Sequence, residues 1–350
     1  MKYLISLLLP ITIPLVTLAA PQPRTIVAMT ELSGATHESG EECRVGFQVA
    51  INNHLKSTDS IKVNIVDHQR LPKVGLTELK KQLDTENVVG IINAGSPVAL
   101  AINPLSMQKK IPNFGLSAVP SFTTANPYAI RTWANAEVES SIIEKFVKEK
   151  NFKDIAMVSL TDDYTLAIAY KLKEKFGSKI LFSQEILKED TDFSSLITKL
   201  KQKNPDVIIL NILGEQSGLF VKRLRELKET AQIVGTFSLG KLNVQQVAGG
   251  LNNLAGTVYA ELNGNKPIFK AETLKASPDS KVSGLGYYCY LTLATALELL
   301  EENPKINSGE ELMSSFLQEQ ENNRTFKVLD EEVQYKNREI VADMKLVRIE

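Results

Sequence analysis

The sequence predicts an α/β fold made of two similar lobes, each a mostly parallel sheet flanked by helices. Short runs rich in Val, Ile and Leu alternate with longer segments whose apolar residues have helical spacing. The connections between them are short, and the whole alternation occurs twice along the chain. Such alternation is typical of parallel strands joined by crossover helices. A chain of 350 residues is long enough for two units of this kind.

The first unit begins after Arg24 with a β-branched run. The segment that follows has apolar residues at the spacing of one helix face, and the pattern then repeats. We expect strands at residues 25–29, 61–67, 88–92 and 113–117, and helices at 40–56, 76–83 and 98–109.

The second unit repeats this order after a first crossing between the lobes at residues 128–133. We expect helices at residues 136–148, 164–176, 193–202 and 217–227, and strands at 155–160, 179–186, 206–212 and 232–237.

The remaining segments do not fit a simple tandem of two units. Residues 254–262 read as an additional strand, 287–302 as a long apolar helix, and the tail from Thr325 as strands. The simplest hypothesis is that the chain returns to the first lobe near Leu254 and crosses again near Thr325. Lobe 1 would then be residues 24–131 plus 254–324, and lobe 2 residues 132–253 plus 325–350.

The first 20 residues are typical of a secretory signal peptide. MKYLISLLLPITIPLVTLAA has one Lys, then an apolar stretch, then small residues. A membrane anchor is the alternative, because the apolar run is of marginal spanning length. Two prolines and the small-residue exit favour cleavage near Ala19 or Ala20. No Cys for lipid attachment stands there, so we expect a soluble exported protein.

Charge and motifs exclude several classes of function. The 40 basic and 41 acidic residues leave a net charge of −1, which argues against a nucleic-acid partner. The sequence contains no GxSxG, GxxxxGK, HExxH or GxGxxG motif. Asp162 and Asp163 are interpreted as acidic residues at a helix start. We therefore expect no catalytic residues and no enzyme.

Cysteines and histidines are few. Cys43 and Cys289 would form a disulfide in an oxidising compartment, or remain two separate thiols. His37, His54 and His68 are scattered, without zinc-ligand spacing. No metal and no cofactor is implied.

Five stretches together resemble a known family. They are IVAMTELSGATHESGEECRVGFQVAINN, INAGSPVALAINPLSMQKKIPNFGLSAVPSFT, NPYAIRTWANAEVES, MVSLTDDYTLAIAYKLKEKFG and TFKVLDEEVQYKNREIVADMKLVRIE. In order and spacing they resemble the type I periplasmic solute-binding proteins of branched-chain amino acid (Leu/Ile/Val) ABC importers. The resemblance covers nearly the whole mature chain and marks a divergent member.

The resemblance implies two lobes with three hinge crossings that close on a ligand. The expected protein is a periplasmic monomer that delivers a small solute to an inner-membrane ABC permease. The alternative is a periplasmic sensor or interaction protein that keeps the fold with a lost or repurposed ligand site.

The stretch NAGSPVALA contains the first expected ligand contact. Ser96 stands at a strand end, before a helix that starts with Pro97. Ligands of open α/β sheets bind at such strand ends. The hydroxyl and the free N–H groups of the first helical turn would suit a carboxylate. The alternative is that Ser96 only caps the helix.

The second ligand loop departs from the family pattern. The alignment places Ser117, Ala118 and Val119 where amino acid binders usually have Ala-Thr. Val119 lacks the Thr hydroxyl, although its N–H could still donate.

The family's acid for the ligand ammonium is also absent from its usual turn, which contains Phe237 and Ser238 here. A buried ammonium without an anionic partner is costly. This argues against a standard α-amino acid ligand, unless Glu31 or Glu215 substitutes from a neighbouring loop.

Tyr164 matches the family's Tyr that lies against the ligand from the second lobe, with Thr165 replacing the usual Gly. An aromatic at a helix start is the alternative interpretation. The expected solute is amino-acid-like, an amide, or a small aromatic or organic acid. The expected contacts are Ser96, Ser117, Ala118, Val119 and Tyr164, with Phe237 and Ser238 in addition.

Overall fold

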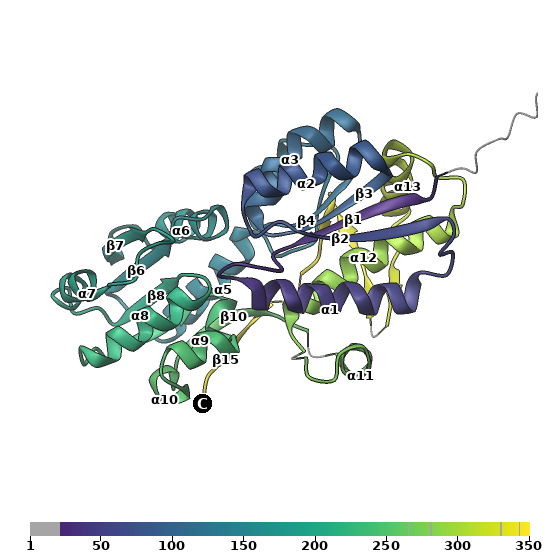
Figure 1. Cartoon of the computed structure of the whole chain (residues 1–350). Helices are drawn as coiled ribbons and strands as arrows, with labels where there is room; N and C mark the ends of the chain where they lie inside the picture. Colours follow the sequence, from purple (N-terminus) through teal and green to yellow (C-terminus); the bar gives the residue numbers. More distant parts are fainter. Residues whose placement is uncertain (1–21, 265, 281, 330, 343) are drawn as a thin grey trace, which may run out of the picture.

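The structure is a computed structural model that describes residues 22–264, 266–280, 282–329, 331–342 and 344–350. Two lobes lie side by side, each with its own sheet (Figure 1). The expected signal peptide at residues 1–20 lies outside the described residues. In the part of the chain that is described, no helix is long and apolar enough to cross a membrane.

Lobe 1 contains the seven-stranded sheet, in the order β13-β14-β5-β4-β3-β1-β2. Its strands are β1 (Arg24–Thr30), β2 (Ile61–Asp67), β3 (Asn87–Ala94), β4 (Asn113–Leu116), β5 (Ala129–Arg131), β13 (Tyr335–Lys336) and β14 (Glu339–Ile340). Its helices are α1 (His37–His54), α2 (Pro72–Thr85), α3 (Ser96–Lys109), α4 (Ser121–Thr124), α11 (Pro267–Ala276), α12 (Gly284–Glu302) and α13 (Gly309–Glu321). Strands β2, β1, β3, β4 and β5 pair in parallel in this order, as expected, and β14 pairs in parallel with β5. Among the described strands of this sheet, β13 and β14 form an antiparallel hairpin.

Lobe 2 contains the six-stranded sheet, in the order β15-β10-β9-β8-β6-β7. Its strands are β6 (Ile155–Leu160), β7 (Ile180–Ile186), β8 (Val207–Asn211), β9 (Gln232–Gly235), β10 (Val258–Leu262) and β15 (Met344–Arg348). Its helices are α5 (Ala136–Glu149), α6 (Asp163–Phe176), α7 (Ser194–Lys201), α8 (Glu215–Glu226), α9 (Leu242–Val247) and α10 (Leu251–Leu254), with 3-10 turns η1 (Gly177–Lys179) and η2 (Phe237–Gly240). A separate antiparallel pair is formed by β11 (Phe326–Val328) and β12 (Glu331–Val333).

The chain crosses three times between the sheets, but two crossings differ from the expected places. β10 pairs in parallel with β9, so residues 254–262 stay in lobe 2 and the chain returns only after Leu262. β14 pairs with β5, so the third crossing follows Ile340 and not Thr325. The local sequence pattern indicates that these segments are strands. Which of the two sheets each strand joins depends on the distant strands with which it pairs.

Helices α1 and α12 of lobe 1 pack against each other (Figure 1). A Cβ on Gly46 would lie 2.1 Å from the carbonyl oxygen of Gly286, so only glycine permits this backbone approach. Cys43 and Cys289 form a disulfide between the same two helices, with their Cα atoms 5.2 Å apart. The structure thus contains the disulfide and not two separate thiols.

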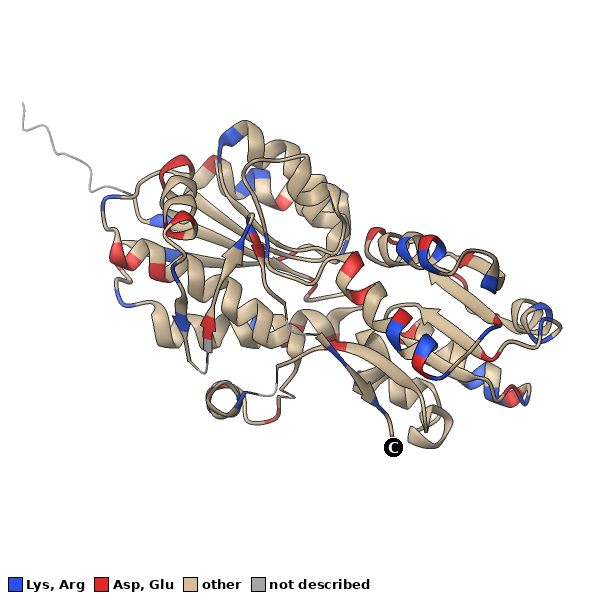
Figure 2. Cartoon of the chain, turned by 180° about the vertical axis from the view of Figure 1, so that it is seen from behind, with Lys and Arg blue, Asp and Glu red and all other residues tan. Residues whose placement is uncertain are grey.

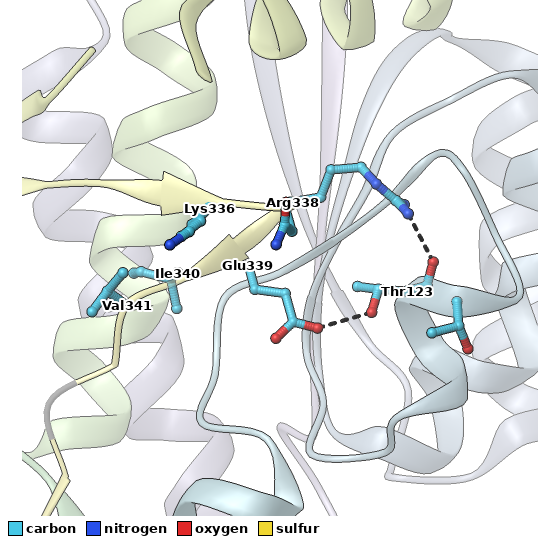
Figure 3. Close-up of a pocket in the computed structure, with 8 residues that line it drawn as sticks. Thr123, Lys336, Arg338, Glu339, Ile340 and Val341 are labelled. Atoms are coloured by element: carbon cyan, nitrogen blue, oxygen red, sulfur yellow. Dashed lines mark hydrogen bonds between the residues drawn. The ribbon is translucent and has the colours of Figure 1, made fainter. Parts of the chain in front are cut away.

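The first and third crossings are held together by side chains of lobe 1. The Arg131 guanidinium donates to Glu339 (2.9 Å), and the Thr123 hydroxyl donates to the same carboxylate (3.0 Å). Arg338 donates to the Thr123 carbonyl oxygen at 3.0 Å (Figure 3). These bonds anchor both crossings in lobe 1 at the end next to lobe 2.

Charged residues of both signs are interspersed over the helices of both lobes (Figure 2). This agrees with the nearly balanced total of 40 basic and 41 acidic residues. A mixed surface of this kind exerts no long-range field of one sign.

Candidate ligand-binding cleft

A cleft lies between the lobes, where strands of both sheets end. Residues from lobe 1 form most of its lining, and the first crossing and lobe 2 supply the rest. The lining residues are Glu31, Arg70, Ala94, Gly95, Ser96, Leu116 and Leu285 from lobe 1, Trp133 from the crossing, and Tyr164 and Phe237 from lobe 2. Most of them follow the carboxyl ends of parallel strands, which is where open α/β sheets bind ligands.

Ser96 lies in the cleft wall as the first residue of α3, with Gly95 in the N-cap position. Gly95 has φ +108°, and Arg70 passes directly over it. The Ser96 oxygen accepts a hydrogen bond from the Ala118 N–H at 3.2 Å. Its hydroxyl proton remains available for donation. Ser96 therefore links the two expected ligand loops and does not cap its own helix.

Of the other expected contacts, Tyr164 and Phe237 line the cleft, whereas the remaining four are not part of the lining. Ser117 and Ala118 are fully buried, and the Ser117 carbonyl accepts a hydrogen bond from Arg131. Val119 belongs to the same loop, and the structure leaves it half-buried.

Two further positions that were considered for the site lie outside it. The Ser238 hydroxyl oxygen is buried and accepts a hydrogen bond from the Gly214 N–H at 2.8 Å. Glu215 begins α8 and is exposed. Of the two acids named as possible substitutes, Glu31 is the one in the cleft.

Aromatic rings form one wall of the cleft. The ring centroid of Phe237 lies 5.8 Å from that of Trp133 and 5.9 Å from that of Tyr164, both in edge-to-face geometry. Tyr288 extends the cluster behind Trp133 at 6.1 Å. Edge-to-face packing holds such rings in defined orientations. The wall therefore suits an apolar or aromatic group on a ligand.

Charged side chains also join the two lobes at this cleft. Arg70 follows β2 of lobe 1, and Asp162 follows β6 of lobe 2. The guanidinium donates to both oxygens of Asp162, at 3.0 Å each, and more weakly to Glu31 at 3.4 Å. A bidentate pair of this kind is among the strongest side-chain contacts. In this conformation the protein's own side chains thus connect the lobes across the cleft.

The two carboxyl groups differ in their titration. Burial raises the pKa of Asp162, but the Arg70 guanidinium, with smaller effects of Lys188 and the Tyr164 N–H, more than compensates, so that pKa lies below its ordinary value. Burial also raises the pKa of Glu31, and here Arg70 compensates only in part, so the pKa stays above its ordinary value. Asp162 is therefore the firmly ionised partner of Arg70.

A second contact between the lobes lies on α1. The Lys241 ammonium of lobe 2 donates to Glu42, which also accepts from the Ser283 hydroxyl at 2.6 Å. Glu38 accepts hydrogen bonds from the backbone N–H groups that start α9, at 3.1 Å. The described conformation is therefore a closed one. Its side chains leave a cavity of only about 30 Å³, so a ligand of amino acid size enters only when the lobes part.

Tyr164 presents its ring to the cleft because its hydroxyl is engaged elsewhere. The hydroxyl donates to the two oxygens of Glu139, at 2.7 and 2.9 Å. Glu139 lies on α5 and is fully buried. Burial raises the pKa of Glu139 to about 7, although the hydrogen bond from Tyr164 acts in the opposite direction. This buried carboxyl group therefore fixes the position of a cleft residue.

Replacement of Glu139 by Gln is expected to change how stability depends on pH. A folded-state pKa above the ordinary 4.5 means that the folded chain binds the extra proton between pH 4.5 and 7, so stability falls as pH rises through that interval. The loss amounts to about 3 kcal/mol. Glu139→Gln keeps an acceptor for Tyr164 and does not titrate. Urea unfolding from pH 4.5 to 8 should show this decline in the unmodified protein and not in the variant.

The exposed Glu149, on the same helix, provides the control. Glu149→Gln should leave the pH profile unchanged. Parallel profiles for Glu139→Gln and the unmodified protein would show that Glu139 does not titrate in this range.

Sequence reasoning missed Arg70, Trp133 and the role of Asp162. Arg70 follows a strand end, and this position alone could have marked it. Its partner Asp162 is 92 residues away, and no local pattern relates the two. Trp133 lies in the predicted crossing and could have been proposed as a cleft residue from that position.

The sequence profile of the periplasmic binding protein family matches residues 23–350. The chain belongs to this family. Its expected function class, a solute-binding protein and not an enzyme, is thereby confirmed.

Relatives within this family are distant. The Leu/Ile/Val-binding protein BraC3 of Rhizobium johnstonii is 24% identical over 276 residues, covering 74% of this chain and 70% of the relative. The Leu/Ile/Val-binding protein homolog 7 of Brucella suis is 28% identical over 214 residues, covering 55% of this chain and about half (53%) of the relative. The chain is thus a divergent periplasmic binding protein.

Solved structures show the same two-lobed fold. A leucine binding protein LivK from Thermotoga maritima has a TM-score of 0.82 at 17% identity, covering 93% of this chain and 95% of its own. A solute binding protein from Rhodopseudomonas palustris, in complex with 3,4-dihydroxy benzoic acid, has a TM-score of 0.80 at 17% identity, covering 94% and 93%. LivJ from Streptococcus pneumoniae, in complex with isoleucine, has a TM-score of 0.78 at 16% identity, covering 93% and 100%. The expected type I fold is confirmed.

Proposed function

We propose that this protein binds a small amino-acid-like or aromatic solute in the cleft and delivers it to an inner-membrane ABC permease. The cleft carries the proposal, because it combines a serine at a helix start, an aromatic wall and the charged side chains of Glu31 and Arg70 at strand ends of lobe 1. Similar folds hold isoleucine in one solved structure and 3,4-dihydroxy benzoic acid in another, which supports both solute types.

The proposed mechanism is closure about the three crossings. A solute that contacts both walls stabilises the closed form by its differential affinity for that form. Ser96 would contact it from lobe 1, and Tyr164 and Phe237 from lobe 2. The other expected contacts would not touch the solute but would hold these loops in shape. They are Ser117, Ala118, Val119 and Ser238. The permease would recognise the closed arrangement of the lobes.

The proposed location is the periplasm, after cleavage of the signal peptide near Ala19 or Ala20. The disulfide between Cys43 and Cys289 suits an oxidising compartment. We propose that the protein acts there as a monomer.

Thermal unfolding with a solute panel tests this function. The mature chain is refolded to remove bound solute and is then heated with amino acids, amides, aromatic acids or short dicarboxylates. A true ligand at one hundred times its Kd adds about 2.7 kcal/mol, which raises Tm measurably. We expect one chemical class to do so, and Ser96→Ala to reduce the shift. Ser314→Ala, at an exposed position on α13, should not.

A second candidate function is favoured by the small cavity, because the protein's own side chains nearly fill the cleft. The bridge from Arg70 to Asp162 occupies the space between the lobes without a solute. This observation favours a periplasmic sensor or interaction protein that has kept the fold. A flat response to the whole panel would reject solute delivery and support this second function.

A further inference from the structure

The polar groups of the cleft differ in whether they have hydrogen-bond partners within the protein. Arg70 directs Nε and Nη2 at Asp162 and Nη1 at Glu31. Asp162 also accepts a hydrogen bond from the backbone N–H of Tyr164 at 3.0 Å. The guanidinium thus has two carboxylate partners within the protein. A ligand carboxylate would have to displace one of them to bind there.

One carboxylate oxygen of Glu31, in contrast, lacks a hydrogen-bond partner among the residues that the structure describes. This oxygen, Oε2, is buried. His68 Nε2 lies 3.9 Å from Oε2. The same nitrogen lies 2.7 Å from the Ala94 carbonyl oxygen, and its proton is directed there. The Glu31 side chain is only 5% exposed, so water has little access to this oxygen.

The unsatisfied oxygen faces the cleft. A Cβ placed on Gly95 would lie 3.8 Å from Glu31 Oε2 and 3.2 Å from Arg70, and Gly95, Glu31 and Arg70 all line the same cavity. A buried acceptor without a donor costs free energy. A solute that brings an N–H donor to this point would remove that cost.

The charge of Glu31 is less fully compensated than that of Asp162. Asp162 is paired with Arg70 and lies 3.8 Å from the Lys188 ammonium, whereas Glu31 has the weaker contact with Arg70, and His68 beside it is held neutral because burial lowers its pKa to about 4. The rings of Trp133 and Phe237 lie at the same cavity. Aromatic faces attract cations in addition to apolar groups.

We propose that the solute carries a protonated amine on a small apolar or aromatic body, and that Glu31 Oε2 binds this amine from lobe 1. This inference rests on the proposed function. The anionic partner missing from the turn at Phe237 and Ser238 is thereby supplied by the loop after β1. Arg70 is already paired with carboxylates of the protein, so we expect it not to recruit a carboxylate of the solute.

The test compares head groups on matched bodies by titration calorimetry of the refolded mature chain. One series is 3-methylbutylamine, leucine and 4-methylpentanoate. The other is phenethylamine, phenylalanine and 3-phenylpropanoate. We expect the amine and the amino acid of at least one series to bind and the corresponding acid to bind at least tenfold more weakly. Equal or tighter binding of the acid would overturn the inference while leaving solute binding intact.

Glu31→Gln keeps the size of the side chain and removes its charge. We expect it to weaken amine binding at least tenfold, and Glu31→Asp to weaken it less. The exposed Glu41, on α1, provides the matched control, because Glu41→Gln changes the same charge outside the cleft. Unchanged affinity in a folded Glu31→Gln protein would reject the role of Glu31. Absence of binding by both series and by the wider panel would reject the proposed function itself.

Discussion

Loss of the disulfide between Cys43 and Cys289 is expected to lower the free energy of unfolding by about 3–5 kcal/mol. The two residues are 246 positions apart, so their bond removes many conformations from the unfolded chain. Both are fully buried between α1 and α12. Urea unfolding of the oxidised protein, the reduced protein and the double variant Cys43→Ala/Cys289→Ala measures the effect.

The double alanine variant also serves as the control for the reducing agent. Dithiothreitol should lower the unfolding midpoint of the unmodified protein and leave that of the variant unchanged. The oxidised protein is first shown to have no free thiols. If its urea unfolding midpoint is then the same before and after complete reduction, this expectation is contradicted.

Arg70→Met is expected to open the lobes and not merely to weaken the fold. Removal of one member of a buried ion pair typically costs about 3–5 kcal/mol, because the other member is left uncompensated. Asp162 and Glu31 belong to different lobes, so separation of the lobes rehydrates both carboxylates. The equilibrium between closed and open forms should therefore shift by about a hundredfold for about 3 kcal/mol.

Small-angle X-ray scattering measures this change as a larger radius of gyration of the ligand-free chain. Arg44→Met is the matched control, since Arg44 pairs with Glu41 on the exposed side of α1. An Arg70→Met protein with an unchanged radius of gyration would show that the contacts of Glu38 and Glu42 with lobe 2 suffice for closure.

Much of the fold was predictable because its signals are local. Helical spacing and β-branched runs identified β1 to β4 and α1 to α3 close to their observed bounds. The extra strand at residues 254–262 was also found, but it was assigned to the wrong lobe. Its place depends on β9 and β15, with which it pairs. Pairing between distant strands leaves no trace in the pattern of one segment.

The same distinction holds in the cleft. Ser96 was predicted from its place at the end of a strand of a parallel sheet, and Tyr164 and Phe237 from the resemblance to the family. All three line the cavity. Glu31 could be named only as an alternative to the family's missing acid, since the position of an acid in the loop after β1 does not show how far it lies from α3. The bridge from Arg70 to Asp162 could not be predicted, because it exists only when the lobes close.

The sequence by itself therefore determined the α/β class, the two-lobed family and the strand ends at which a ligand is expected. These follow from periodicity and from the order of short stretches along the chain. Only the tertiary structure decided which strands share a sheet, that Cys43 pairs with Cys289, and which charges meet in the cleft. Each of these depends on contacts between residues far apart in the chain, which form only when each lobe has folded, and the contact of Arg70 with Asp162 also requires the lobes to close.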